Sequence, residues 1–586
     1  MRELERVEHI TVRLESQKSP PGTWRSRAWL DVPPRTVLVD FSGLQVRKTG
    51  TQILLGQGGY RPIALVVAAL VFCAMVLLPV PESLVRLMEQ ENPSGYSMSG
   101  AGAETIVDSV NLHKNPEAFA AVGEGGAAAK SVKILESSED VARQAMIMVA
   151  ILVVAALLWG TKGLPIAGTV TTVAVLMLTF GILSPNELAK TFMNDAVLFI
   201  LGILAVAVGV SKTGLDKRIG LLLLSRIKSA GAFAFIFFPV LAVSSAFLSA
   251  HALVALLVPV IMGVYKATCN SHGVKKDRAL AILLLLGISF AANIGGPGSP
   301  AAGARNAIMI GYLADAGSPI GFGEWMKYGM PLVPVLALTV GAYMYVRCKP
   351  KLLVKSVNPS EVVKREVKEL PRFGGKEAAM AFILVTLVVA WMTLQSTLGM
   401  GGATLAAVCA MFLFRIATWD DIQRGVAFDV VGLYGAASAI AVGLAFTGGG
   451  LWLATQTVEL MPSYLGEGNR LIMGVSIMTA TLTNFMSDGA TVGTLGPLVL
   501  PMAELADVSV WKVGLMVSFA SSFANVLVVG TPNNAIVFAM SKDPETGQRL
   551  LSVFDFIKYG LPLTVLLMFV LWGWALFGYW TVLSWP

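Results

Sequence analysis

Charged residues are scarce in this chain. Asp, Glu, Lys and Arg together make up 14% of its 586 residues, whereas a typical soluble domain carries about 25%. Hydrophobic residues make up 55%, and the mean hydropathy is +0.70. This composition excludes an ordinary soluble protein and predicts an all-α protein that crosses a membrane many times.

Cysteines and catalytic motifs are also scarce. The four cysteines (Cys73, Cys269, Cys348 and Cys409) lie in or beside apolar segments and form no CxxC pair, so we expect neither a disulfide nor a cysteine metal site. The sequence contains no HExxH, no GxGD, no paired acids in adjacent apolar segments and no Walker sequence. We therefore expect no enzyme, no ATP-driven pump and no cofactor.

Long apolar segments recur along the chain. Eleven of them approach the ~20 residues that cross a bilayer: 62–80, 144–160, 165–184, 195–210, 279–294, 330–347, 378–395, 401–416, 428–445, 512–529 and 557–580. The first begins behind a charged tail, so it does not have the form of a signal peptide.

The basic residues gather in two segments and predict the orientation. Residues 1–60 and 347–376 each hold nine Lys and Arg, whereas 83–140 holds four, against nine acids. By the positive-inside rule the tail and the central linker are cytoplasmic and 83–140 is outside. The count of spans agrees only if 232–263 and 471–505 do not cross, and it then leaves the C-terminus outside. Because the charges flank predicted spans, we expect no nucleic acid partner.

The two excluded segments predict helical hairpins. Each has a polar centre, in "SAHALVALLVP" (249–259) and "SDGATVGTLGP" (487–497). Folded there, each gives arms of ~15 residues, or ~22 Å, short of the ~30 Å hydrocarbon core. A hairpin that enters and leaves by one side, with its tip buried or in a wet cavity, fits these lengths.

The hairpins belong to a longer repeat. "GISFAANIGGPGSPAAGARNAIMIGYL" (287–313) matches "MVSFASSFANVLVVGTPNNAIVFAMS" (516–541), and "FGEWMKYGMPLVPVL" (322–336) matches "VFDFIKYGLPLTVLL" (553–567). The offsets are 238 for Ser249 and Ser487, 228 for Asn306 and Asn534, and 231 for Tyr328 and Tyr559. Five spans per unit is an odd number, so the second unit is inverted. Inverted repeats with broken helices indicate a secondary transporter with its site near the midplane.

The predicted spans and the repeat divide the chain into six parts. They are a cytoplasmic segment (1–60) with short β-strand patterns in "ITVRLES" and "RTVLVDFSGLQV", a leading transmembrane helix (61–82), an extracytoplasmic and flexible loop (83–143), a first repeat (144–347), a cytoplasmic linker (348–377) and a second repeat (378–586). An amphipathic helix on the cytoplasmic surface is predicted by the basic residues that flank "IGLLLL", namely Lys212, Lys217, Arg218, Arg226 and Lys228.

The order of span, hairpin, broken span and "KYG(M/L)P" span, repeated behind one leading helix, resembles the divalent anion:sodium symporters, which carry dicarboxylates, citrate or sulfate. The resemblance covers roughly 62–82 and 144–580. It implies an elevator-type symporter in the plasma membrane, with Na+ as coupling ion, and we expect a homodimer. Family members have two Ser-Asn-Thr tips, which here read Ser249-Ala250-His251 and Ser487-Asp488-Gly489. The family's Thr-Pro is kept as Thr531-Pro532, but the first copy reads Gly303-Ala304, followed by Arg305.

The resemblance implies two sets of site residues. The substrate set is Ser249, His251, Arg305, Asn306, Ser487, Gly489, Thr531 and Pro532. The Na+ set is Ser245, Ser249, Thr483, Ser487 and Asp488. Helix ends at the tips attract ions of both signs: the N-termini attract anions and the C-termini attract cations.

Three ionisable residues have more than one interpretation. Asp488 is a cation or proton site, since an ionisable residue at this depth costs ~3 kcal/mol or more, or it caps a hairpin arm. His251 is a core group, a ligand contact or the partner of Asp488 in a charge pair. Arg305 is a bidentate clamp on an anion, or it snorkels to an interface.

The sequence therefore predicts a secondary active transporter of a small anion such as a dicarboxylate or sulfate, coupled to Na+. The alternative is a proton-coupled anion transporter, or a cation/proton antiporter of related architecture, that uses Asp488. The residues leave open which anion is carried and whether Na+ or H+ drives it.

Overall fold

The computed structural model describes residues 11–17, 25–32, 35–40, 61–93, 96, 103–116, 119, 135–225, 227, 229–354, 366, 368, 372–460, 466–542 and 548–586. The chain forms two compact units, Met1–Ile63 and Ala64–Pro586. The first unit contains a three-stranded antiparallel sheet in the order β1-β2-β3. Its strands are β1 (Thr11–Gln17), β2 (Arg25–Val32) and β3 (Arg35–Asp40), with Thr11 opposite Asp31 and Arg27 opposite Asp40.

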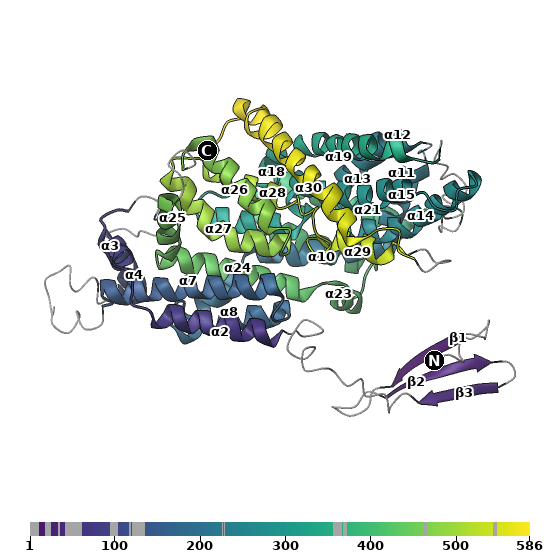
Figure 1. Ribbon diagram of the computed structural model, residues 1–586. Helices are drawn as coiled ribbons and strands as arrows, with labels where there is room; N and C mark the ends of the chain where they lie inside the picture. The colour runs from purple at the N-terminus through teal and green to yellow at the C-terminus, as the bar shows by residue number, and fades with distance from the viewer. Residues whose placement is uncertain are drawn as a thin grey trace. The chain divides into compact units, whose positions relative to one another are not determined.

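The second unit is helical (Figure 1). Up to the linker its α-helices are α2 (Pro62–Leu77), α3 (Glu82–Glu89), α4 (Ile106–Lys114), α7 (Ser138–Thr161), α8 (Ile166–Thr179), α9 (Pro185–Phe192), α10 (Asp195–Thr213), α11 (Leu215–Ser225), α12 (Ala230–Ala232), α13 (Phe238–Ser245), α14 (Ala250–Ser271), α15 (Arg278–Ala281), α16 (Gly287–Ile294), α17 (Ala304–Asp315), α18 (Phe322–Gly329) and α19 (Leu332–Cys348). After it come α21 (Gly375–Thr393), α22 (Gln395–Leu413), α23 (Trp419–Gly425), α24 (Phe428–Phe446), α25 (Gly449–Leu460), α26 (Gly468–Leu482), α27 (Asp488–Leu505), α28 (Val510–Ala520), α29 (Pro532–Met540) and α30 (Val553–Val570).

Nine helices within the described residues are long and apolar enough to cross a bilayer, or ten if the bent pair α2 and α3 forms one span. Eight of the nine coincide with predicted spans. The ninth is α14, which belongs to the first predicted hairpin. Two predicted spans, 165–184 and 512–529, coincide with helices of only 14 and 11 residues, α8 and α28.

The first hairpin is longer than predicted. Its first arm runs from α12 through a π-helical turn (Phe233–Phe237) into α13, and its second arm is α14. Helix α14 has 22 residues because it continues past Pro259 to Ser271, so the predicted boundary at residue 263 is wrong. At about 33 Å this arm is long enough to cross the bilayer. The length of α14 therefore does not exclude a crossing by this arm. A hairpin that enters and leaves by one side is supported here only by the sequence repeat.

The loop predicted to be flexible contains two helices. Helix α4 begins with a capping box between Thr105 and Asp108, which satisfies two free backbone N–H groups. Lys114 at its end donates hydrogen bonds to the Gln144 side chain on α7, at 2.7 Å, and to Glu136, at 3.3 Å. The prediction of a flexible loop is therefore wrong for α3 and α4.

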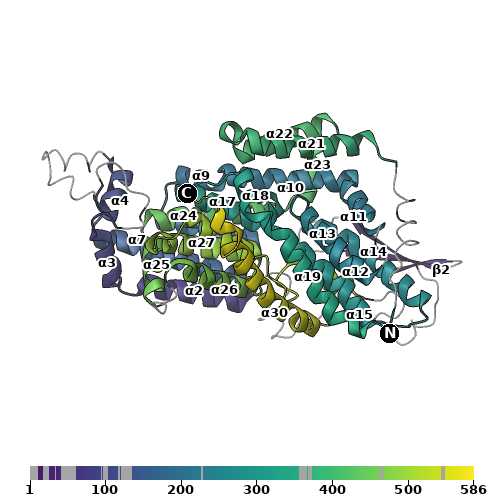
Figure 2. The ribbon, with the colours of Figure 1, turned by 90° about the horizontal axis from the view of Figure 1, so that it is seen from above.

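Two groups of helices flank the hairpins. Helices α7, α8 and α24 pack together along one side of the unit (Figure 1), and α21 and α22 pack on α10 along another (Figure 2). Helix α22 contains a break at Gly399, which has a φ of 64°. The Asp195 carboxylate fills that break and accepts hydrogen bonds from the N–H groups of Met400 and Gly401, at 3.0 and 2.9 Å.

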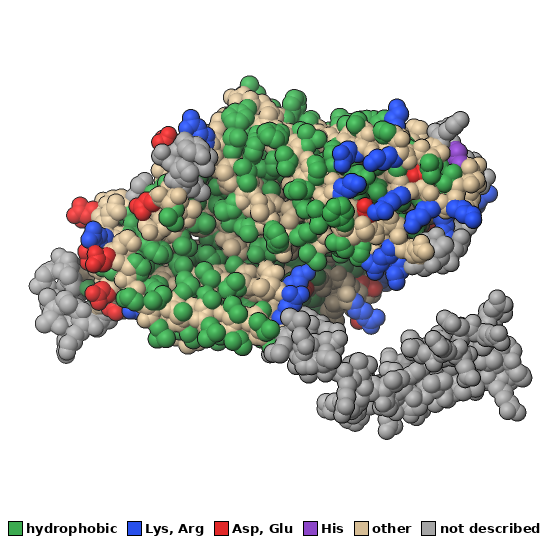
Figure 3. Space-filling model, viewed as in Figure 1, with side chains coloured by type: hydrophobic (Ala, Val, Ile, Leu, Met, Phe, Trp, Pro, Cys, Tyr) green, Lys and Arg blue, Asp and Glu red, His purple; other side chains and the backbone are tan. Residues whose placement is uncertain are grey.

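The surface charges separate along the helical unit. Hydrophobic side chains cover the middle of the visible face, between acidic residues at the end with α3 and α4 and basic residues at the end with α14 and α15 (Figure 3). The exposed acids include Glu82, Glu89 and Glu91, and the exposed bases include Lys275 and Lys276. A broad apolar surface between two charged ends is the pattern of a bilayer-spanning protein.

The predicted amphipathic surface helix is α11, which is tied to the start of α21. The Arg218 guanidinium donates two hydrogen bonds to the Glu377 carboxylate, at 2.9 and 3.0 Å, and lies 5.6 Å from the centre of the Phe373 ring. A bidentate pair of this kind fixes orientation as well as distance.

Candidate functional site

Four helices begin at the wall of one cavity. Helices α14 and α27 start at the two hairpin tips, and α17 and α29 start where the two broken stretches end. The cavity has a volume of about 60 Å³, and residues from the first turn of all four helices line it: His251, Arg305, Asp488 and Asn533. The first turn of a helix has unpaired N–H groups and carries a partial positive charge. Four converging N-termini therefore bias the cavity towards anions.

Two asparagines hold the broken stretches in place. The Asn306 amide donates to the carbonyl oxygens of Gly296 and Ser299, both at 2.7 Å. The Asn534 amide, 228 residues later, donates to those of Ala524 and Leu527, at 2.8 and 2.9 Å. These acceptors are also 228 residues apart, so the two copies use the same contacts. Each amide satisfies carbonyl groups that the helix break leaves without a partner.

Glycines in the two "KYG" segments allow the following helix to reach the same breaks. A Cβ atom on Gly329 would lie 2.0 Å from the Pro297 carbonyl oxygen, and one on Gly560 would lie 2.1 Å from that of Asn525. Real Cβ atoms do not approach so closely, so only glycine fits at either position. The repeated "KYG" phrase is explained by this contact.

Arg305 and Asp488 form an ion pair in the cavity. Arg305 Nη1 donates to Asp488 Oδ2, which joins the start of α17 to the tip of the second hairpin. The side chains are 8% and 21% exposed, respectively. The guanidinium lies over Gly296, where a Cβ atom would be 1.6 Å from Nη2. Arg305 therefore does not snorkel to an interface, and the small residues around it make room for its head group.

His251 has a different partner from the one predicted. Its Nδ1 atom lies 2.8 Å from the Asn533 Oδ1 atom, and the Asn533 amide donates to Asn293 at 2.9 Å. The Asn293 amide in turn donates to Asn525 at 3.1 Å. The predicted pair of His251 with Asp488 is wrong, because Arg305 at the opposing helix start binds the Asp488 carboxylate.

Of the other predicted substrate residues only Thr531 is among those that line the cavity in the described part of the chain; Ser249, Asn306, Ser487, Gly489 and Pro532 are not. Thr531, Ser249 and Ser487 cap their helices by accepting a hydrogen bond from the N–H three residues on. Their neighbours Gly489 and Pro532 lie in the first turns of α27 and α29. Contact of these residues with a solute stays a prediction.

Two of the four hydroxyl groups predicted to bind sodium, those of Ser245 and Thr483, are buried, whereas Ser249 and Ser487 at the tips are exposed. Ser245 donates to the Leu241 carbonyl and Thr483 to the Ser521 carbonyl, each at 2.8 Å. Both oxygens keep lone pairs with which to bind a cation. Asp488, the carboxylate of the set, is held by Arg305 and accepts from the Gly489 N–H at 2.8 Å. Their role as Na+ ligands stays a prediction.

Sequence reasoning did not identify Asn293, Ser522 and Asn533 as part of the site. All three are buried and line the cavity. The available signal was an isolated Asn in the apolar run "FAANIGG" and the doubled Asn in "TPNNAI". Polar side chains in such runs are expensive to bury and point to a site.

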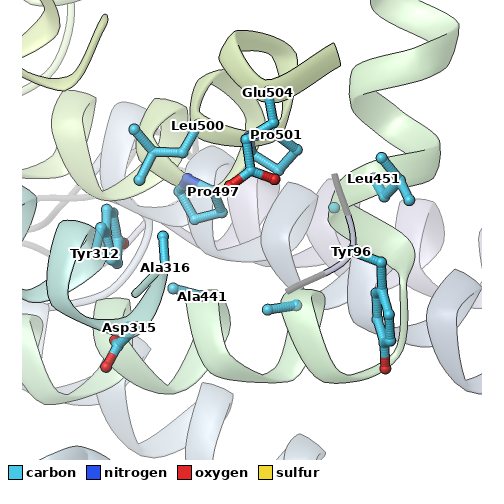
Figure 4. A pocket seen from close by; sticks show the side chains of 12 residues that line it. Tyr96, Tyr312, Asp315, Ala316, Ala441, Leu451, Pro497, Leu500, Pro501 and Glu504 are labelled. Atoms are coloured by element: carbon cyan, nitrogen blue, oxygen red, sulfur yellow. The ribbon is translucent and has the colours of Figure 1, made fainter. Parts of the chain in front are cut away.

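A second cavity has the opposite electrostatic character. It has a volume of about 60 Å³, and its wall includes the acids Asp315 and Glu504 together with Tyr96, Tyr312 and the apolar side chains around Pro497 (Figure 4). Neither Lys nor Arg is among the residues that line it. An anion would be repelled by both carboxylates, so the cavity with Arg305 is the better candidate for anion binding.

A many-helix membrane unit whose broken helices surround a polar cavity defines a membrane transporter. Residues 127–585 match the family model described as the sodium:sulfate symporter transmembrane region, and the chain belongs to that family. Its members are transporters and not enzymes.

Several characterised proteins are similar to the chain. The sodium-dependent high-affinity dicarboxylate transporter 3 of Caenorhabditis elegans is 28% identical over 65% of this chain and 75% of its own. The sodium-dependent dicarboxylate transporter SdcS of Staphylococcus saprophyticus is 25% identical over 70% and 83%. Among solved structures, the Alcanivorax borkumensis YdaH transporter aligns over 76% of this chain and 99% of its own, with a TM-score of 0.47 and 14% identity.

Proposed function

We propose that this protein is a Na+-coupled symporter of a small dianion, of the dicarboxylate or sulfate class. The observation that carries the proposal is the cavity in which four helix N-termini and the Arg305 guanidinium meet. The relatives in Caenorhabditis elegans and Staphylococcus saprophyticus are sodium-dependent dicarboxylate transporters, which supports both the anion and the coupling ion.

In this proposal Arg305 binds the anion and the helix starts orient it. A guanidinium presents five N–H donors in a planar fork that matches carboxylate and sulfate oxygens. The cations are bound near Ser245 and Thr483, where buried hydroxyls meet the carbonyl groups of the hairpin arm and the broken stretch. Sodium there would offset the second negative charge of the solute.

The proposed mechanism is elevator-type alternating access. The tips and broken stretches are tied together by the Arg305–Asp488, His251–Asn533 and Asn293–Asn525 contacts. Such a cross-linked group moves as one body more readily than it opens. It would slide past the α10, α21 and α22 layer and past α7, α8 and α24. We further propose a homodimer in the plasma membrane with its acidic end and C-terminus outside.

Uptake into proteoliposomes tests the function. Purified protein is reconstituted, and accumulation of labelled succinate, citrate and sulfate is followed under an inward Na+ gradient, an inward proton gradient, or neither. We expect at least one dianion to accumulate only with the Na+ gradient. Accumulation driven by a proton gradient alone would favour a proton-coupled anion transporter instead. No anion uptake under any gradient would refute the proposal.

A further inference from the structure

The Arg305–Asp488 pair places a negative charge of the protein where the proposed anion should bind. Arg305 belongs to the start of α17 and Asp488 to the tip of the second hairpin, and both line the same cavity. A cavity built only to attract a dianion would keep its guanidinium free, because a like charge beside the ligand weakens binding. The carboxylate therefore needs its own explanation.

The Arg305 guanidinium has N–H donors that its pair with Asp488 does not use. One of its five donors, on Nη1, bonds Asp488, while Nε is buried and has no hydrogen-bond partner within the described part of the chain. The hydroxyl of Ser522, which also lines the cavity, is likewise buried without a partner there. The pair is thus a single contact rather than a two-pronged one, and a ligand that offers two oxygens can replace it.

Asp488 can be reached by a cation from the cavity that it lines. It is the first residue of α27, at a tip where the chain reverses direction, and it already accepts a hydrogen bond from the Gly489 N–H. Its side chain is the more exposed member of the pair. A cation that bound the carboxylate would cancel its charge and leave the guanidinium to the solute.

We propose that Asp488 competes inside the protein with the transported anion for Arg305. The proposal rests on the anion-binding function proposed above. Without solute the Asp488 carboxylate binds the Arg305 guanidinium, and the two side-chain charges cancel in the cavity. When a cation neutralises Asp488, the anion takes its place. Asp488 thereby sets the anion affinity and makes it depend on the cation.

The test is anion binding to the purified full chain, with and without sodium. Titration calorimetry with succinate and sulfate is run in Na+ buffer and in choline buffer of equal ionic strength. Asp488→Asn removes the charge and keeps a side chain that accepts a hydrogen bond. The matched control is Asp507→Asn, an exposed site just past the other end of α27 with a φ of 51°, a conformation that Asn tolerates.

We expect Asp488→Asn to bind the anion at least tenfold more tightly than the wild type in choline buffer. We also expect its gain in affinity on adding sodium to be much smaller than that of the wild type. Asp507→Asn should match the wild type in both buffers. Should Asp488→Asn not fold, Asp488→Ser, which also removes the charge and leaves the Ser487 cap in place, tests the same prediction.

Two results overturn the inference, and they differ. If the wild type and Asp507→Asn bind an anion but both Asp488 variants bind it equally or more weakly in choline buffer, Asp488 does not compete, and the proposed function stands. If none of these proteins binds an anion in either buffer, the proposed function fails and the inference fails with it.

Discussion

The Gly296→Ala substitution probes the guanidinium without changing any charge. The new Cβ atom would lie 1.6 Å from Arg305 Nη2 and 2.4 Å from the Ser522 hydroxyl oxygen, whereas carbon contacts lie near 3.5–4 Å. The guanidinium is the end of a flexible side chain, so it must move by about 2 Å. A shift of that size takes the guanidinium N–H groups beyond hydrogen-bond distance of an anion bound in the cavity as proposed above.

The expected loss follows from that displacement. A hydrogen bond to a charged group is worth about 1.5–3 kcal/mol, so the dissociation constant of the transported anion should rise roughly tenfold to hundredfold. Crowding in this buried site should also destabilise the fold by about 1–3 kcal/mol. Calorimetric titration measures the first effect, and thermal unfolding measures the second.

Gly474→Ala is the matched control. Gly474 lies within the hairpin arm α26, and a Cβ atom there would meet no atom within 4 Å. This variant should bind the anion as the wild type does and be slightly more stable, because alanine favours a helix more than glycine does. If Gly296→Ala also binds and unfolds like the wild type, the guanidinium is not confined over Gly296 and the described site geometry is incorrect.

Three further predictions follow from the site and the topology. Arg305→Ala should weaken anion binding about tenfold to hundredfold and Arg305→Lys should recover only part of it; uptake kinetics measure this, and normal transport by the Ala variant would remove Arg305 from the site. Gly560→Ala should abolish folding or lower the thermal midpoint strongly, since its Cβ would meet the Asn525 carbonyl oxygen at 2.1 Å; an unchanged midpoint would contradict that contact. In a chain whose native cysteines are changed to serine, Glu91→Cys should react with an impermeant maleimide from outside and Lys376→Cys should not; labelling of both from one side would refute the orientation.

The breaks in the helices could be predicted from sequence because their causes are local. Gly and Pro cluster at 295–303, and helices end where such residues interrupt an apolar run. The tips were equally visible, since Ser249 and Ser487 carry the side chains that cap a helix start. The end of α14 was missed because the helix continues past Pro259, although it ends at Ser271, just before Gly273 with its φ of 66°.

The partners of the site residues could not be predicted because they are distant in sequence. Arg305 and Asp488 are 183 positions apart, and His251 and Asn533 are 282 apart. Local patterns identify polar residues at each helix start but do not show which starts face one another. The sequence therefore indicated three of the four side chains, and one of the interpretations of His251 paired it with Asp488, which binds Arg305 instead.

The two polar contacts across the cavity are unlike. Arg305 and Asn533 occupy matching positions, 228 residues apart, yet one binds a carboxylate and the other an imidazole. Two identical copies of the repeat on separate chains would have to carry the same residue at both positions, giving either two positive charges or none. Because both copies lie on one chain, the cavity has the Arg305–Asp488 ion pair on one side and the His251–Asn533 contact on the other. A dianion held there would have its two ends in different environments, so the protein should distinguish the two ends of an unsymmetrical dicarboxylate.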